Sequence, residues 1–193
     1  MLNQQILSLI DRGSRVLDLG CGQGDLLSLL HLEKEVVGYG VEQSYDSICA
    51  CLSKGIDAFQ GDILQSLKLF SDQSFDVVIL SQTLQEVEQP LLVLKEVLRV
   101  GKQAIVTFPN FGHWKCRLQL LMGNPPKNDL LPFDWYNTPN IRVISISSFY
   151  RLCRAEKINV LKQVCADRYF LNRFFSLFFS NLFSEKGFFF ISS

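Results

Sequence analysis

One short apolar run in this chain leads directly into a turn with three glycines: Val16-Leu17-Asp18-Leu19-Gly20-Cys21-Gly22-Gln23-Gly24. A periodic helix pattern follows, with leucines at positions 26, 27, 29 and 30. A strand that turns into a helix within a few residues needs backbone angles that are open mainly to glycine. Such a turn leaves free N–H groups at the start of the helix, where a polar ligand group can bind. The pattern therefore predicts an α/β fold with a strand–turn–helix ligand site near its beginning.

Acidic residues near this turn indicate which ligand it takes. The dinucleotide fingerprint G-x-G-x-x-G requires a third glycine where this chain has Asp25. The chain instead reads D-x-G-x-G-x-G, with Asp18 two residues before the first glycine, and no Lys or Arg lies between Arg15 and Lys34. Glu42 and Asp62 follow two further predicted strands. Carboxylates repel phosphate and suit a cationic ligand with ribose hydroxyls, so we expect S-adenosylmethionine (SAM).

Three of these residues also have a purely structural interpretation. Asp18 could be a turn or capping acid, although its place in the motif favours ligand binding. For Asp62 the two interpretations are balanced, because a helix cap before Ile63-Leu64 would use the same side chain. Cys21 is expected to fill space in the turn rather than to act as a nucleophile.

Predicted strands and helices alternate along the chain. The strand patterns lie at 16–19, 36–41, 56–60, 75–80 and 103–108, and those at 158–164 and 187–191 are expected to pair antiparallel at one edge. Helices are expected at 2–10, after a cap at Ser44, from Pro90, and after a cap at Ser147. The fold class is therefore a Rossmann-like open sheet, mostly parallel, with an antiparallel edge hairpin. In such sheets ligands bind beyond the carboxyl ends of the strands.

Length and composition restrict the classes of function. The 193 residues, 48% hydrophobic and 20% charged, fit a single domain spanning 1–193. The net charge is zero and no basic run occurs, so nucleic acid is not expected as a partner. No signal peptide is evident, and the six cysteines form no C-x-x-C pair and accompany only two histidines. We therefore expect a cytoplasmic protein with reduced thiols and no metal site.

Two segments interrupt the regular pattern. Residues 110–144 include a predicted helix at 114–122 and then an irregular stretch with Trp135 and Tyr136 between prolines. We expect this segment to form a lid or a partner surface, the alternative being a loop that covers the core. The phenylalanine-rich run 170–183 is too short and too interrupted to span a bilayer. It could be a helix buried on the sheet or a docking face for a partner, and no membrane association is expected.

The glycine turn resembles the first motif of class I SAM-dependent methyltransferases. The resemblance implies that Gly20, Gly22 and Gly24 pass the methionine end of SAM, that Glu42 holds the ribose hydroxyls, and that Asp62 and Ile63 flank the adenine. The expected site for SAM, or for its product S-adenosyl-L-homocysteine, then comprises Asp18, Gly20, Cys21, Gly22, Gly24, Glu42, Gln43, Asp62, Ile63 and Ser81.

Four further stretches resemble the MetW family of methionine biosynthesis proteins. They are Ser81-Gln82-Thr83-Leu84-Gln85, Leu98-Arg99-Val100-Gly101, the run 108–114 (FPNFGHW) and the run 131–141 (LPFDWYNTPNI). The likeness extends from about residue 13 to the final strand. It implies a cytoplasmic SAM-type fold that works with homoserine O-acyltransferase, and it leaves a homodimer open. Gln23 is a departure, because many relatives carry an acid there.

Whether the chain is itself an enzyme stays open at this point. Methyl transfer depends mostly on alignment and exclusion of water, although oxygen and nitrogen acceptors often need a base as well. The candidates beyond the fourth and fifth strands are Gln82, Asn110 and His113, and His113 could instead orient Trp114 or a backbone carbonyl. The Asn-Pro-Pro-Tyr motif of amino-group methyltransferases is absent. We favour a SAM-binding subunit that acts with homoserine O-acyltransferase. A stand-alone small-molecule methyltransferase is the alternative, and an NAD-dependent oxidoreductase is disfavoured.

Overall fold

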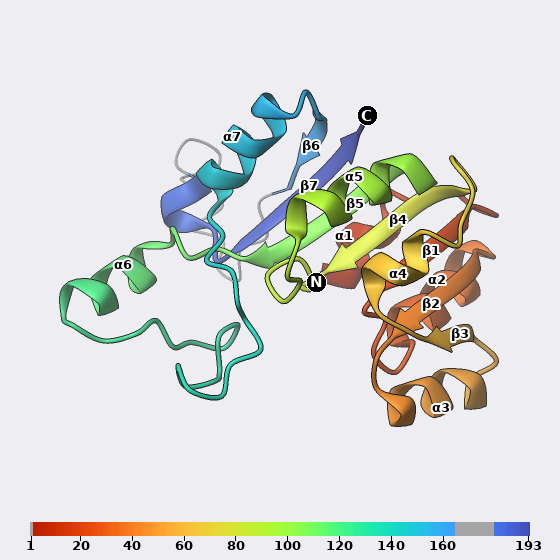
Figure 1. The fold of residues 1–193 in the computed structure, drawn as a ribbon, viewed down its shortest axis with the longest axis horizontal. Helices are drawn as coiled ribbons and strands as arrows, with labels where there is room; N and C mark the ends of the chain where they lie inside the picture. The colour runs from red at the N-terminus through yellow and green to blue at the C-terminus, as the bar shows by residue number, and fades with distance from the viewer. Residues whose placement is uncertain (1, 165–179) are drawn as a thin grey trace.

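The sheet organises the computed structural model, which describes residues 2–164 and 180–193 (Figure 1). Seven strands in these ranges form one sheet in the order β3-β2-β1-β4-β5-β7-β6. The strands β1 to β5 are parallel, whereas β7 is antiparallel to β5 and β6 is antiparallel to β7. This confirms the mostly parallel sheet with an antiparallel edge hairpin. The bounds are β1 Arg15–Leu19, β2 Val37–Glu42, β3 Asp57–Gln60, β4 Phe75–Ser81, β5 Gly101–Pro109, β6 Asn159–Gln163 and β7 Lys186–Ser192.

The helices between the strands begin at recognisable caps. Ser44 accepts a hydrogen bond from the Ser47 amide at the start of α3, and Pro90 stands in the first turn of α5, both as predicted. The cap of α7 is Ser145, not Ser147, because Ser145 and Ser148 form a reciprocal capping box. The bounds are α1 Leu2–Leu7, α2 Asp25–Lys34, α3 Tyr45–Ser53, α4 Ile63–Leu67, α5 Pro90–Val100, α6 Trp114–Leu121 and α7 Ile146–Ala155.

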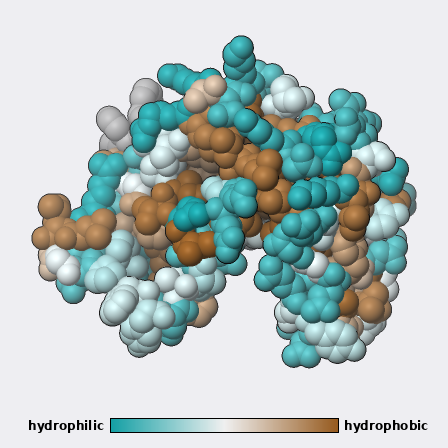
Figure 2. Space-filling model, viewed as in Figure 1, coloured by the Kyte–Doolittle hydropathy of each residue, from teal (hydrophilic) through white to brown (hydrophobic). Residues whose placement is uncertain are grey.

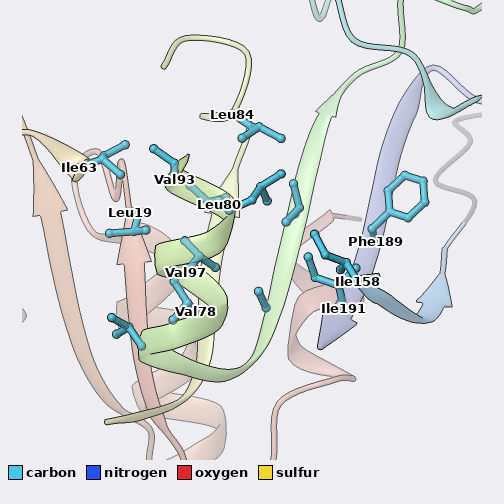
Figure 3. Close-up of a cluster of buried hydrophobic side chains, with 14 of the residues drawn as sticks. Leu19, Ile63, Val78, Leu80, Leu84, Val93, Val97, Ile158, Phe189 and Ile191 are labelled. Carbon is cyan, nitrogen blue, oxygen red and sulfur yellow. The ribbon is translucent and has the colours of Figure 1, made fainter. Parts of the chain in front are cut away.

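Alternate residues of the central strands build two cores, one on each face of the sheet. On β4, Val77 and Ile79 belong to a cluster that includes side chains from α1, α2 and α3. Val78 and Leu80 belong to the opposite cluster, where α4, α5 and α7 pack. Figure 3 shows this second core, with Val93 and Val97 of α5 lying over Val78 and Leu80. A strand covered on both faces needs apolar residues at every position, which explains the unbroken apolar run in β4.

The segment 110–144 leaves the sheet after β5. It forms α6 and then an irregular path without further helices or named strands, as Figure 1 shows at the left of the molecule. The predicted helix at 114–122 is therefore confirmed to within one residue. Most of the phenylalanine-rich run 170–183 lies outside the described residues, and only 180–183 is seen, as a helical turn. In the part of the chain that the structure describes, we find no helix with the length and apolar character needed to cross a membrane.

Candidate functional site

A cavity of about 650 Å³ lies at the carboxyl ends of the parallel strands. Figure 2 shows the surface hollowed between the part that carries α6 and the part that carries α3. The cavity walls come from the ends of β1, β2 and β4, from the turn before α4, from the loop before α5, and from the 110–144 segment. The lining residues are Gly20, Val41, Glu42, Gln43, Gly61, Asp62, Ile63, Leu64, Gln65, Ser81, Gln82, Thr83, Glu86, Val87, Glu88, Gln89, Val93 and Ile141.

The glycine turn contributes Gly20 to the cavity wall and is tightly packed from behind. Gly20 has φ +76°, and a Cβ built on it would lie 2.8 Å from the Thr83 hydroxyl oxygen. Gly24, with φ +77°, caps α2, and its Cβ would lie 2.9 Å from the sulfur of Cys51. Both positions therefore require glycine for two reasons, the left-handed backbone and the lack of room. The Gly20 amide donates to the Val41 carbonyl at 2.8 Å, which holds the turn against β2.

Glu42 joins this turn to the start of α3. Its Oε2 accepts a hydrogen bond from the Gly22 amide at 3.0 Å, and its Oε1 accepts from the amides of Gln43 at 2.7 Å and Ser44 at 3.1 Å. These bonds fix the carboxylate at the cavity wall. Each carboxylate oxygen has two acceptor sites, so Oε1 is fully used and Oε2 retains one site for a hydroxyl donor of a ligand.

Asp18 lies behind the turn and is almost completely enclosed. Its side chain is 2% exposed, and Oδ1 has no hydrogen-bond partner among the described residues. Burial, reinforced by the negative charge of Glu42, raises the pKa of the Asp18 carboxyl to about 7. An unpartnered buried oxygen is destabilising. Asp18 does not line the cavity, so its charge acts on a ligand there from behind the turn.

The electrostatic character of the cavity is acidic. Glu42, Asp62, Glu86 and Glu88 line it, and none of its lining residues is Lys, Arg or His. Lys54 does reach the glycine turn from α3, where its ammonium contacts the Gln23 carbonyl at 2.7 Å and pairs with Asp25. That cation does not line the cavity, and Asp25 offsets its charge. The cavity therefore favours a cationic ligand and disfavours a diphosphate.

Asp62 and Ile63 stand where the sequence places them. Asp62 accepts a hydrogen bond from the Gln65 amide at 3.0 Å and so caps α4, which is the structural role considered above. The same residue also lines the cavity, so capping does not remove it from the site. Ile63 is 8% exposed, and its side chain contributes both to the core and to the cavity wall.

The end of β4 forms the opposite wall. Ser81 and Gln82 line the cavity, and Gln82 has φ +58°, a strained backbone for a residue other than glycine. The Gln82 amide donates to both the carbonyl oxygen and the hydroxyl of Thr107, at 3.0 and 3.1 Å, which stabilises this conformation. Thr83 donates its hydroxyl to the Leu19 carbonyl at 3.0 Å. This bond connects the wall to the glycine turn.

A strap from the 110–144 segment closes the cavity rim. The backbone carbonyl of Gln85 accepts hydrogen bonds from the amides of Ile141 at 3.0 Å and Arg142 at 2.9 Å, and the Arg142 guanidinium donates to the Glu88 carbonyl. The sequence analysis did not identify Thr83, Gln85 or Ile141 as site residues. The available signal was the family likeness of the stretches 81–85, which contains Thr83 and Gln85, and 131–141, which ends at Ile141; the likeness does not say what these residues do.

Six candidate residues do not line the cavity: Asp18, Cys21, Gly22, Gly24, Asn110 and His113. Asn110 is 2% exposed and is fully hydrogen bonded within the protein. His113 is 3% exposed and caps α6, and burial lowers the pKa of its imidazole. Cys21 packs behind the turn, 3.9 Å from the sulfur of Cys51 and against Gly40, and burial raises the pKa of its thiol. Its place agrees with a space-filling role. Among the described residues, no group of three or more His, Cys, Asp or Glu side chains is placed to hold a metal ion.

Comparison with known proteins identifies the family. The model of the methionine biosynthesis protein MetW matches residues 3–191. The chain belongs to the MetW family. A bifunctional methionine biosynthesis protein MetXA/MetW from Rhodopirellula baltica is 40% identical over 154 residues, which are 75% of this chain and 25% of the relative. This MetW chain therefore spans only about a quarter of the length of that relative.

Solved structures share the fold of this MetW chain at low sequence identity. A SAM-dependent methyltransferase from Archaeoglobus fulgidus is similar at TM-score 0.65 and 16% identity, over 99% of this chain and 94% of the other. A SAM-dependent methyltransferase from Aquifex aeolicus is similar at TM-score 0.65 and 15% identity, over 98% and 88%. The [4+2]-cyclase SpnF is similar at TM-score 0.67 and 16% identity, over 100% and 80%. The fold is thus that of class I SAM-dependent methyltransferases, and it also supports other chemistry.

Proposed function

We propose that this MetW-family chain is a SAM-binding subunit that acts together with homoserine O-acyltransferase in methionine biosynthesis. The observation that carries the proposal is the acid-lined cavity beside the glycine turn, in a chain whose family is joined to MetXA in one relative. The cavity supports SAM as the ligand, and the fused relative supports homoserine O-acyltransferase as the partner. A cavity of about 650 Å³ is within the range that small-molecule sites occupy.

The residues present fit SAM group by group. The ionised carboxylate of Asp18, behind the turn, favours the ammonium of the methionine end electrostatically, and Gly20 leaves bare backbone at the cavity wall. One ribose hydroxyl can donate to the remaining acceptor site on Oε2 of Glu42, whose carboxylate the turn amides hold in place. Ile63 offers an apolar surface to the adenine ring, beside Asp62. SAM would supply an activated methyl group, and this chain would supply alignment and exclusion of water.

A stand-alone small-molecule methyltransferase is the second candidate. The strained backbone of Gln82 at the cavity wall favours it, because such strain is concentrated at functional sites. The described residues offer little for proton transfer, however. His113 is buried outside the cavity. The wall beyond β4 offers the amide of Gln82 and the carboxylates of Glu86 and Glu88. An acceptor that must lose a proton would have to use Glu86, whose pKa is raised by the surrounding protein and by Glu42.

Titration with SAM tests the ligand assignment. Glu42→Ala should weaken SAM binding by about 1–3 kcal/mol, as expected for loss of a hydrogen bond to a charged group. The exposed Glu33 on α2 provides a matched control, and Glu33→Ala should bind SAM like the wild type. Calorimetry with SAM and with NADH is the measurement. Tight binding of NADH without binding of SAM would contradict the assignment and favour the oxidoreductase.

Co-purification with the acyltransferase of the same organism tests the partner assignment. We expect a complex, and we expect acyl transfer to homoserine to rise when the chain is added to the acyltransferase. The rate is measured with and without the chain at equal acyltransferase concentration. Absence of any complex, together with a methylated small-molecule product formed by the chain alone, would exclude the accessory role and establish the second candidate.

A further inference from the structure

Exposed apolar side chains are concentrated on one part of the molecule. Seventeen large hydrophobic residues are exposed in the described ranges, and ten of them lie between Trp114 and Val143. We call the surface of these residues other than Ile141 the 114–143 face; its six most exposed members are Leu120, Leu121, Met122, Trp135, Tyr136 and Val143. Figure 2 shows part of it as the hydrophobic surface at the left end, over α6. A patch of this kind on a protein surface marks an interaction site.

Polar contacts, rather than burial, hold this face in shape. The Gln119 side chain donates to the Lys127 carbonyl at 2.9 Å and accepts from the Lys127 amide at 3.2 Å, which ties α6 to the loop beyond it. Asn128 accepts from the Leu131 amide at 3.1 Å, and Leu131 is anchored in the interior at 4% exposure. Lys127 pairs with Asp134 at 2.8 Å. The loop is thus ordered by its own contacts while its aromatic residues stay in solvent.

Trp135 and Tyr136 form the centre of the loop part of the face. Their rings meet edge to face with centroids 5.7 Å apart, and the two side chains are 75% and 70% exposed. Tryptophan and tyrosine are the residue types that most often carry binding energy in protein interfaces. A pair of rings already packed on each other loses little freedom when a partner covers it, which favours binding.

The 114–143 face is not a cover for the cavity. Of the residues between 114 and 143, Ile141 lines the cavity, whereas Trp135, Tyr136 and Leu121 do not. The strap at 141–142 is the part that meets the cavity rim through Gln85. The aromatic and leucine side chains of the face are directed to solvent instead. The segment therefore divides into a strap for the cavity and a separate surface for a macromolecule.

We infer that the 114–143 face is the docking surface for homoserine O-acyltransferase. The inference rests on the proposed function and adds the location of the contact. In the Rhodopirellula baltica relative, the match to this chain accounts for 25% of a protein that is named MetXA/MetW, so about three quarters of its length lies outside the match. The comparisons therefore favour another protein as the partner that covers this face. Lys127 is paired to Asp134 within the segment, and Lys115 is paired to Glu185 outside it, so the charges of these two lysines are offset and do not favour an anionic membrane.

A binding measurement tests this inference. The affinity of the chain for the acyltransferase of the same organism is measured by biolayer interferometry with full-length proteins. Trp135→Ala/Tyr136→Ala and Leu120→Ala/Leu121→Ala should each weaken binding about tenfold or more. The matched control is Leu32→Ala/Leu69→Ala, since these leucines are 77% and 78% exposed outside the face. It should bind like the wild type. Urea unfolding of each variant identifies any that do not fold.

Hydrogen exchange of the unmodified chain provides a measurement that needs no variant. Complex formation should protect amides within 114–143 and leave those around Leu32 and Leu69 unchanged. Failure of the wild-type chain to bind would contradict the proposed partnership itself. Wild-type binding with unweakened face variants, or with protection elsewhere, would leave the partnership standing and overturn the docking surface. Loss of self-association in the face variants of the chain alone would assign the face to a second copy and likewise overturn the inference.

Discussion

The variant Asp18→Asn should gain stability relative to the wild type as the pH rises. The unfolding free energy of the variant minus that of the wild type should increase by on the order of 4 kcal/mol from about pH 4 to about pH 7 and stay constant above pH 7. The wild-type carboxyl has a pKa of about 7 in the folded protein, against an ordinary value of 3.8 for aspartate. The folded state therefore binds more protons than the unfolded state between these values. The contribution of Asp18 to the wild-type unfolding free energy is fully present below pH 3.8 and is lost as the pH rises to 7. The asparagine does not titrate, so it escapes the loss.

Urea unfolding of both proteins across this pH range gives the difference directly. The comparison removes the contribution of every titrating group that does not interact with Asp18. The negative charge of Glu42 does act on Asp18, so the measured difference includes the interaction between these two carboxylates. The comparison also removes any constant effect of the amide itself. Cys21 and Cys51 lie near Asp18, but burial raises the pKa of both thiols, so they stay neutral here. A pH-independent difference would show that Asp18 is not held in an environment that disfavours its charge.

The same variant should bind SAM more weakly than the wild type. A role in ligand binding would account for an acid at a position where its charge is destabilising. A cation next to Asp18 favours the ionised carboxyl, so wild-type affinity should rise with pH up to about 7 and then level off. Asp18→Asn should show a lower affinity without this rise. A variant whose stability relative to the wild type rises between pH 4 and pH 7, and which nevertheless binds SAM less tightly, is the expected signature of a group retained for its ligand. Equal affinity of the two proteins at pH 8 would contradict the role assigned to Asp18.

The sheet and the positions of the acids follow from local patterns in the sequence. Apolar strands separated by helices lead to a parallel sheet, and the carboxyl ends of parallel strands meet at one edge. That is why Asp18, Glu42 and Asp62, far apart in the chain, were expected together, and the structure brings all three to the cavity or directly behind it. Their hydrogen bonds could not be predicted, because the same acid can cap a helix and face a ligand, as Asp62 does.

The strap could not be predicted, for a different reason. Gln85 meets Ile141 and Arg142 through its backbone carbonyl, so neither the residue type nor its spacing signals the contact. The cap of α7 shows a similar limit, since Ser145, Ser147 and Ser148 are close in the sequence and all are able to cap. Only Ser145 and Ser148 have the three-residue spacing of a reciprocal capping box. Residue type likewise made Asn110 a catalytic candidate, although its surroundings give it another role.

Asn110 connects three parts of the chain at the end of β5. Its amide nitrogen donates to the carbonyls of Asn181 at 3.0 Å and Ser184 at 2.7 Å. Its amide oxygen accepts from the amides of Gly112 at 2.9 Å and Ile146 at 3.2 Å. The side chain thus joins the 110–144 segment, the start of α7 and the approach to β7, and all its hydrogen-bonding capacity is in use at 2% exposure.

Asn110→Ala should therefore destabilise the protein by about 3–5 kcal/mol, because four buried backbone groups lose their partner at once and water has no access to replace it. Asn124→Ala is the matched control, since Asn124 is exposed and its amide has only a local contact; the change there should be below about 0.5 kcal/mol. Urea unfolding at pH 7 measures both. A catalytic Asn110 would give the opposite pattern, with unchanged unfolding free energy and lost activity. Because a buried, fully bonded amide has no group left to offer a substrate, the loss of stability is the result we expect.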